Sequence, residues 1–219
     1  MSTTPQQMKG STTTDFEASK KAFHDAMEKA QNQITGATAE LQKLRADMKT
    51  QTAEARDKTT AQVQEVAKQL DAVRQQEQQM IEEHLKVLHT DIEAINAELK
   101  HATAAAKTAA EAKAKVLREE YDSARRALIA SMEAELAEWK VLIDEARHLA
   151  AEKKAEVKAS VQAKMSDLHA KYDAAQKKVH ALKQANAAAF NELHRGTKTA
   201  VGEMKTALQH ARAEIAKVS

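Results

Sequence analysis

The sequence is poor in the residues that build disulfides, turns and large cores. It has no cysteine, one proline (Pro5) and four glycines, and only 3% of its residues are aromatic. The absence of cysteine excludes a disulfide framework and thiolate chemistry. No glycine or proline lies between Gly36 and Gly196, which argues against a sheet protein because hairpins need these residues for their turns. So few aromatic residues also argue against an aromatic-lined cofactor pocket.

The charges are many but balanced. The chain has 34 Lys and Arg against 32 Asp and Glu, a net charge of +2, and charged residues make up 30% of it. Much of the 42% hydrophobic fraction is alanine. Disordered chains usually combine low hydrophobicity with a high net charge, whereas this composition is typical of long helices and coiled coils. No apolar run approaches the roughly 20 residues of a membrane span, and the N-terminus lacks the apolar region of a secretory signal. We therefore expect a soluble, cytoplasmic protein.

Apolar residues recur at spacings of three and four along most of the chain, which predicts amphipathic helices. The residues predicted to pack helix against helix are Leu41, Leu44, Val66, Leu70, Leu85, Leu88, Ile92, Ile95, Leu99, Leu128, Leu136, Trp139, Ile143, Leu168, Tyr172, Leu182, Phe190 and Leu193. Several of them advance by eleven, as from Leu128 to Trp139. Eleven residues in three turns is about 3.67 residues per turn, close to a straight helix. The predicted fold is all-α, either an elongated long-helix coiled coil or a helical hairpin or bundle with hendecad-like periodicity.

The chain divides into three predicted segments. Residues 1–13 form a disordered tail of Ser, Thr and Gln, residues 14–184 form long coiled-coil helices, and residues 185–219 form a C-terminal helix. Thr14 and Glu17 fit a capping box, with a hydroxyl at the helix start and a carboxylate three residues later.

A single helix of this length would leave its apolar stripe in water, so the chain must bend, associate with copies or lie on an apolar surface. Breaks are expected at Gly36 and within residues 75–79, 101–115 and 185–202. Gly196 and Gly202 are the predicted hinge residues, because each glycine costs a helix about 1 kcal/mol relative to alanine. We expect the last helix to fold back onto residues before 182.

Residues that could carry chemistry are scattered. Glu145 and His148 form a Glu-x-x-His pair, as in di-iron helical bundles, but those sites need a second pair and the sequence has none. His84 and His89 are five residues apart and therefore lie on different faces of a helix. Phosphate-binding glycine loops and zinc-protease motifs are also missing. We expect no catalytic residues, no metal, no cofactor and no small-molecule substrate, and hence a protein that is not an enzyme.

Three classes of partner could cover the apolar stripe. Self-association into a homo-oligomer, as a scaffold or filament, suits a stripe rich in alanine and threonine, because small residues allow close helix contact. An amphipathic-helix coat on a lipid membrane or storage granule, like apolipoproteins or phasins, is the first alternative, although such helices normally present bulky apolar residues. Weak nucleic-acid binding is the second, because residues 150–219 carry a surplus of Lys and Arg.

Residues 132–215 also carry a family resemblance. Their features are Glu138-Trp139, Ile143-Asp144, the run from Leu182 to Phe190, then Leu193 and Gly196. This segment resembles a bacterial family of long-helix coiled-coil proteins described as stress-response proteins. The chain departs from the family at Ala187, where glycine is usual, and at Phe190 and Val201, where tryptophan is usual. The resemblance implies an α-helical, oligomeric protein with a role in stress and no known catalysis.

Overall fold

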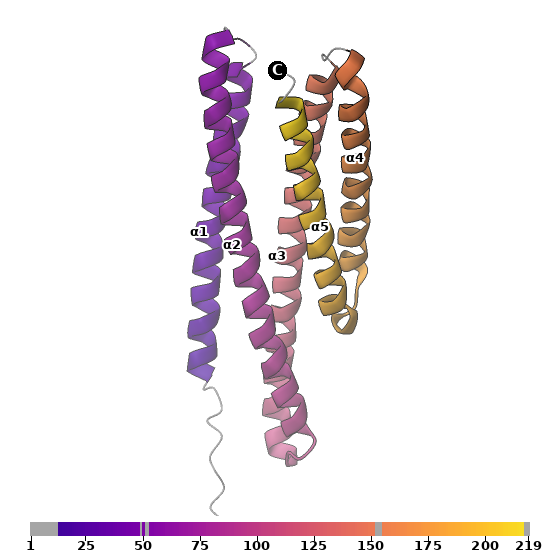
Figure 1. The fold of residues 1–219 in the computed structure, drawn as a ribbon. Coiled ribbons are helices and arrows are strands. Elements are labelled where there is room, and N and C mark those ends of the chain that lie inside the picture. The colour runs from indigo at the N-terminus through magenta and orange to yellow at the C-terminus, as the bar shows by residue number, and fades with distance from the viewer. Residues whose placement is uncertain (1–12, 49, 51–52, 152–154, 217–219) are drawn as a thin grey trace, which may run out of the picture. The chain divides into compact units, whose positions relative to one another are not determined.

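The structure is a computed structural model that describes residues 13–48, 50, 53–151 and 155–216. Within these residues every regular element is a helix, which confirms the all-α prediction. The helices are α1 (Thr13–Met48), α2 (Ala53–Leu99), α3 (Ala104–Ala151), α4 (Ala155–Gln184) and α5 (Ala187–Ala216), as drawn in Figure 1. The helix predicted from the capping box starts one residue earlier, at Thr13. The rest of the predicted disordered tail lies outside the described residues.

The chain consists of two compact units, Met1–Leu117 and Arg118–Ser219. In the first unit α1 packs against α2. The ring of Phe23 on α1 stacks on the ring of His84 on α2, with centroids 3.9 Å apart. Nearer the connection between the two helices, a buried cluster joins Ile34, Leu41, Val66 and Leu70. Residues late in α1 thus meet residues early in α2, so the two helices form an antiparallel hairpin.

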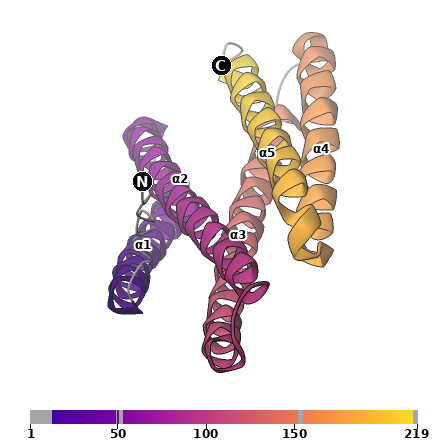
Figure 2. The same ribbon diagram turned by 90° about the horizontal axis from the view of Figure 1, so that it is seen from below.

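The second unit joins the C-terminal part of α3 with α4 and α5. Glu133 of α3 and Lys183 near the end of α4 form an ion pair of 2.9 Å. The ammonium group of Lys178 on α4 donates a hydrogen bond of 3.1 Å to the carbonyl oxygen of Gly196 on α5. The hydroxyl oxygen of Thr197 on α5 lies 3.4 Å from the carbonyl oxygen of Lys178. Figures 1 and 2 show α4 and α5 side by side from two directions.

Most of the predicted packing residues are buried. The buried ones are Leu41, Val66, Leu70, Leu85, Leu88, Ile95, Leu128, Leu136, Trp139, Ile143, Leu168, Tyr172, Leu182 and Phe190. Leu44, Ile92 and Leu99 are half-buried. Because these positions come from every one of the five helices, the apolar stripe is used largely for packing within the chain.

Leu193 is the exception, because it is 37% exposed and the expectation that it packs between helices is wrong. After Phe190, the next packed position on α5 can lie three or four residues later, and the sequence spacing allows both. In the structure the packed position is four residues later, at His194, whose ring stacks on that of Phe190 with centroids 6.0 Å apart. The packed side then continues to Thr197, which is fully buried. The hydroxyl of Thr197 donates a hydrogen bond of 2.8 Å to the carbonyl oxygen of Leu193, so this buried polar group has a partner.

The predicted break positions are only partly correct. Gly36 lies inside α1 and residues 75–79 lie inside α2, so no break occurs at either. The connection between α2 and α3, residues 100–103, overlaps the start of the predicted segment 101–115. The end of α1 at Met48 and the end of α3 at Ala151 fall in stretches with neither glycine nor proline, where the apolar spacing continues and gave no sign of a break.

The assignment of Gly196 and Gly202 as hinge residues is wrong, because both lie inside α5. The chain reverses at Ala185 and Asn186, within the segment 185–202, and the last helix packs back against α4. None of the glycines in the described residues has a positive φ, so their backbone is available to any residue. Helix propensity alone therefore misplaced the turn, because packing against α4 outweighs the cost of two glycines.

Replacing these glycines with alanine is expected to stabilise the protein. A Cβ at Gly36 or Gly202 would meet nothing within 4 Å, and one at Gly196 would lie 3.9 Å from the ammonium of Lys178, an ordinary contact. Gly36→Ala, Gly196→Ala and Gly202→Ala should each raise the free energy of unfolding by up to about 1 kcal/mol. Urea denaturation followed by circular dichroism measures this. A loss of stability in either α5 variant would instead assign that glycine a role in bending.

Candidate functional site

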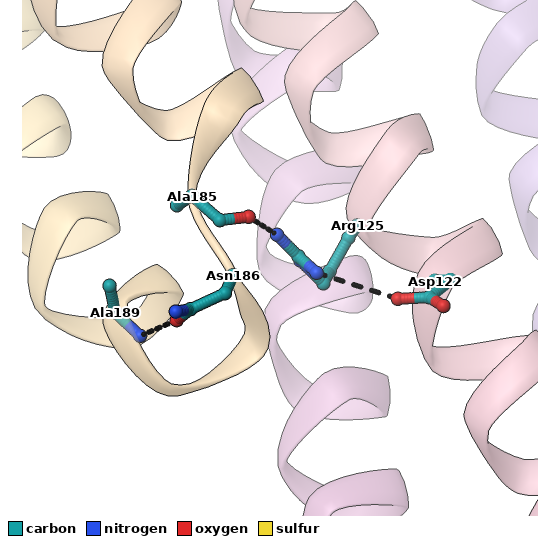
Figure 3. A network of polar contacts seen from close by, with 5 residues as sticks. All are labelled: Asp122, Arg125, Ala185, Asn186 and Ala189. Carbon is teal, nitrogen blue, oxygen red and sulfur yellow. Dashed lines mark hydrogen bonds and ion pairs between the residues drawn. The ribbon is translucent and has the colours of Figure 1, made fainter.

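A cluster of polar contacts in the second unit lies where α4 turns into α5 (Figure 3). Arg125 reaches this turn from α3 and donates from Nη2 to the carbonyl oxygen of Ala185, at 2.6 Å. Its Nη1 lies 3.4 Å from a carboxylate oxygen of Asp122, one turn earlier on α3. We call the group Asp122, Arg125, Ala185, Asn186 and Phe190 the arginine junction.

The junction explains how the chain reverses without glycine or proline. The last carbonyls of a helix have no partner within the helix, and a buried helix end needs one from elsewhere. Arg125 supplies it for Ala185. On the other side of the turn, the side-chain oxygen of Asn186 accepts a hydrogen bond from the backbone N–H of Ala189, at 2.9 Å. Asparagine is among the preferred residues at this capping position, so α5 starts here.

Phe190 completes the junction by covering the arginine. The guanidinium carbon of Arg125 lies 4.4 Å from the centroid of the Phe190 ring and 6.0 Å from that of Tyr121. Phe190 is 1% exposed, and the side chain of Arg125 is 13% exposed. A cation against an aromatic face contributes more when water is kept away. One arginine therefore connects α3, the end of α4 and the start of α5.

The two tyrosines of the second unit both have a raised pKa. For Tyr172 the main cause is burial, and the negative charges of Asp173 and Asp144 raise the pKa further. For Tyr121 burial is again the largest cause, opposed in part by the positive charge of Arg125. Both phenols stay neutral at physiological pH. Both tyrosines are buried, as core residues are.

The described residues offer little that could hold a small molecule or an ion. Within that part of the chain, no three His, Asp or Glu side chains gather as metal ligands. A shallow hollow lies on the surface of α1, and its lining comes from Asp25, Glu28, Lys29, Asn32 and Gln33. All five are side chains of one helix, so no second element closes the hollow. His84, which is buried, uses its ring to stack on Phe23.

A row of aliphatic residues on α2 turns gradually away from the helix hairpin. Val66, Val73, Met80 and Val87 are each seven residues apart, and we call them the α2 row. Val66 is 8% exposed, Val73 and Met80 are half-buried, and Val87 is 53% exposed. A repeat of seven drifts by about 20° per repeat around a straight helix, which explains the progression. The α2 row therefore starts in the contact with α1 and ends in solvent.

The part of α3 in the second unit has two apolar faces. Leu128, Met132, Leu136, Trp139 and Ile143 are buried. The opposite side of the same helix carries Ala127, Ala130, Ala134, Ala137 and Val141, again at spacings of three and four, and we call it the α3 outer face. Ala127 is half-buried and the other four are exposed, Val141 by 45%. The bulky residues thus lie inside the unit and the small ones outside it.

Sequence reasoning missed the arginine junction, although two signals for it were present. Arg125 occupies an apolar position, because it follows Tyr121 by four residues and precedes Leu128 by three. A charged residue within an apolar stripe needs a buried partner. Asn186, followed by alanines and Phe190, also has the form of a helix start. The predicted hinge residues, by contrast, contribute no side chain to the turn.

Comparisons with known proteins give no relative for this chain: no family model, no curated protein and no solved structure matches it.

Across the described residues, no helix combines the length and the apolar character needed to span a membrane.

Replacing Arg125 should weaken the second unit. Arg125→Met keeps much of the volume but removes the hydrogen bond to Ala185 and the contact of a cation with Phe190. We expect a loss of about 2 kcal/mol in the free energy of unfolding, since hydrogen bonds from charged groups contribute about 1.5–3 kcal/mol. Urea denaturation followed by Trp139 fluorescence reports on this unit. Arg195→Met on the exposed surface of α5 is the matched control and should change stability little; equal effects in both variants would contradict the role of the junction.

The raised pKa of Tyr172 should make stability fall at alkaline pH. The neutral phenol is favoured in the folded state, so its contribution is complete below the unfolded pKa of 10.0 and is lost as the pH rises through the higher folded pKa. Urea denaturation at pH values below and above 10 should therefore show a smaller alkaline loss for Tyr172→Phe than for the unaltered chain. Lysine titration affects both proteins alike. Identical losses would show that Tyr172 titrates as in the unfolded chain.

Proposed function

We propose that the protein is a non-enzymatic, self-associating helical scaffold, and that the α2 row carries the association. The observation behind this proposal is the exposure of Val87 at the end of a row that begins in the core. Seven-residue rows are the pattern that a second helix follows when two helices wind around each other left-handedly. A partner helix in that geometry would cover Met80, which is half-buried, and Val87, which is 53% exposed.

A second copy of the chain is the occupant that we propose for the α2 row. Exposed charges of both signs surround the helices, which suits specific pairing between protein helices better than insertion into lipid. The bulky side chains that a lipid coat would need, such as Trp139 and Leu136, are buried within the second unit. Helices that lie on membranes present such residues outward. Among the described residues, the exposed large apolar side chains are three valines and Leu193.

A role in stress protection, as implied by the family resemblance of residues 132–215, belongs to the same proposal. Such a role asks for a stable, water-exposed helical protein that assembles, and it asks for no catalytic site. A cytoplasmic location is part of this proposal as well.

The proposal is tested by disrupting the α2 row. Val87→Glu places a charge on the exposed aliphatic position, where the monomer can solvate it, and should weaken self-association at least about tenfold because burial of a charge opposes pairing. Sedimentation velocity over a range of concentrations measures this, and the melting midpoint should rise with concentration more steeply for the unaltered chain and for Leu193→Glu than for Val87→Glu. Leu193→Glu is the control, because Leu193 is exposed but lies outside the row.

Three outcomes would contradict the proposal. A chain that stays monomeric at every concentration is no self-associating scaffold. An unchanged association of Val87→Glu would place the interface elsewhere. A monomer that sediments only with added vesicles of anionic and zwitterionic lipid would assign the exposed positions to a lipid surface instead.

A further inference from the structure

We propose that two copies of the chain exchange α5, because the turn between α4 and α5 can straighten into a continuous helix. In this exchanged dimer the α5 of each copy packs on the α4 of the other, through the contacts that the hairpin makes within one chain. The inference concerns the second unit alone. It adds to the proposed scaffold function a route of association that does not involve the α2 row.

The turn takes the place of one helical hydrogen bond. In a continuous α-helix, the backbone N–H of Ala189 would bond to the carbonyl of Ala185, four residues earlier. The turn separates these two groups and gives each a side-chain partner (Figure 3). Arg125 donates to the carbonyl of Ala185 at 2.6 Å, and the side-chain oxygen of Asn186 accepts from the N–H of Ala189 at 2.9 Å. Straightening would therefore return both backbone groups to each other and leave neither without a partner.

The backbone of the turn does not require the bend. Ala185 and Asn186 connect the two helices, and residues 183–189 contain neither glycine nor proline. Among the described residues, none has a positive φ. Alanine is the best helix former, and asparagine is tolerated inside a helix at a modest cost. The bend therefore depends on the side chains of Arg125 and Asn186, which are the groups that a straight helix would release.

The buried sides of α4 and α5 would form one continuous side of a straight helix. At about 100° per residue, all buried residues of both helices fall within an arc of about 120°. They are Val161, Met165, Leu168, Tyr172, Ala175, Val179, Leu182, Phe190, Thr197, Ala200, Met204, Ala207, Leu208 and Ala211. The phase is kept across the turn, where Phe190 follows Val179 by eleven residues, or about three turns. A hairpin does not need this common phase, whereas a straight helix that pairs along its whole length does.

The lengths of the two helices also suit an exchange, since α4 and α5 have 30 residues each. The turn thus lies at the middle of residues 155–216. Two straightened copies, paired antiparallel about a two-fold axis at the turn, would cover each other along this whole segment. Lys178 of one copy would then bind the carbonyl of Gly196 of the second copy, and symmetry would form the same contact again.

A second copy is needed because of what a straight α5 would expose. Phe190, Met204 and Leu208 are each 2% exposed or less in the hairpin. Straightening within a single chain would place them in water, which the hydrophobic effect opposes. The α4 of a second copy offers the same contacts, so the exchanged dimer is favoured as the protein concentration rises. Short connections between packed elements are known to favour such exchanges.

Two substitutions at the turn test the exchange in opposite directions, both in the Val87→Glu background that disrupts the α2 row. Asn186→Ala removes the cap of α5 and adds a helix former. It should raise the dimerisation constant about a hundredfold, at about tenfold for each of the two turns in a dimer. Ala187→Pro should abolish the dimer, because proline suits the first position of α5 but not the interior of a continuous helix. Each variant is concentrated, warmed and then analysed by size-exclusion chromatography with light scattering.

Cross-linking identifies the exchanged contact, and the cysteine-free sequence is suited to it. In the dimer of Asn186→Ala, a short bismaleimide should join Lys178→Cys to Gly196→Cys between two chains, which gives the mass of a dimer under denaturing conditions. In the monomer the same link should stay within one chain. Glu133→Cys with Lys183→Cys is the control. Because α3 and α4 stay together in the exchanged dimer, this second link should remain within one chain in both forms.

A second measurement keeps the test valid if Asn186→Ala fails to fold. The Val87→Glu chain, with its turn unaltered, is refolded from urea at high and at low protein concentration. High concentration should give the exchanged dimer, and low concentration the monomer. Ala187→Pro in the same background should give only monomer at both concentrations.

The outcomes separate this proposal from the scaffold function. Monomers alone, both from Asn186→Ala and from refolding with the unaltered turn, would overturn the exchange. So would equal dimerisation of Ala187→Pro, or a dimer in which the link between positions 178 and 196 stays within one chain. In each of these cases, an association of the unaltered chain that Val87→Glu weakens would leave the scaffold function standing. An exchanged dimer that forms equally well with and without Val87→Glu would support the exchange and contradict the role of the α2 row.

Discussion

The structure depends on the need of amphipathic helices to cover one apolar side. An isolated helix gains little stability in water, and most of what it has in a protein comes from packing. This chain meets the need with its own neighbours in sequence: α1 with α2 in the first unit, and α3, α4 and α5 in the second. Antiparallel pairing places the large apolar residues inside each unit. The exposed positions among the described residues are then mostly polar or charged residues and alanine.

The sequence predicted the helices and their inner sides well, because apolar spacing reports directly on which side of a helix is buried. Leu128, Leu136 and Trp139 are buried as the spacing required. Leu193 was misassigned because spacing alone cannot choose between positions three and four residues after Phe190. In the structure His194, four residues after Phe190, is the position that packs, because its ring stacks on that of Phe190.

The turns were harder to predict because they depend on contacts between distant residues. Glycine is a good indicator of a turn when the backbone needs a positive φ, and no glycine in the described residues has one. The reversal after α4 instead depends on Arg125, which is 60 residues away from Ala185 in sequence. A local pattern could show that Asn186 suits a helix start. It could not show that a carbonyl one residue earlier would find its partner on another helix.

The pairing of helices that follow one another also has a consequence for how the chain forms. Contacts between sequence neighbours close short loops, and proteins built from such contacts fold fast, in microseconds to milliseconds. The α1–α2 hairpin contains all the residues that it needs once Leu99 has been synthesised, so it can form while the second unit is still being translated. The second unit must wait for Ala185 and Phe190 before Arg125 gains its partners. Synthesis from the ribosome therefore orders the assembly of the two units in time, with the hairpin first and the arginine junction last.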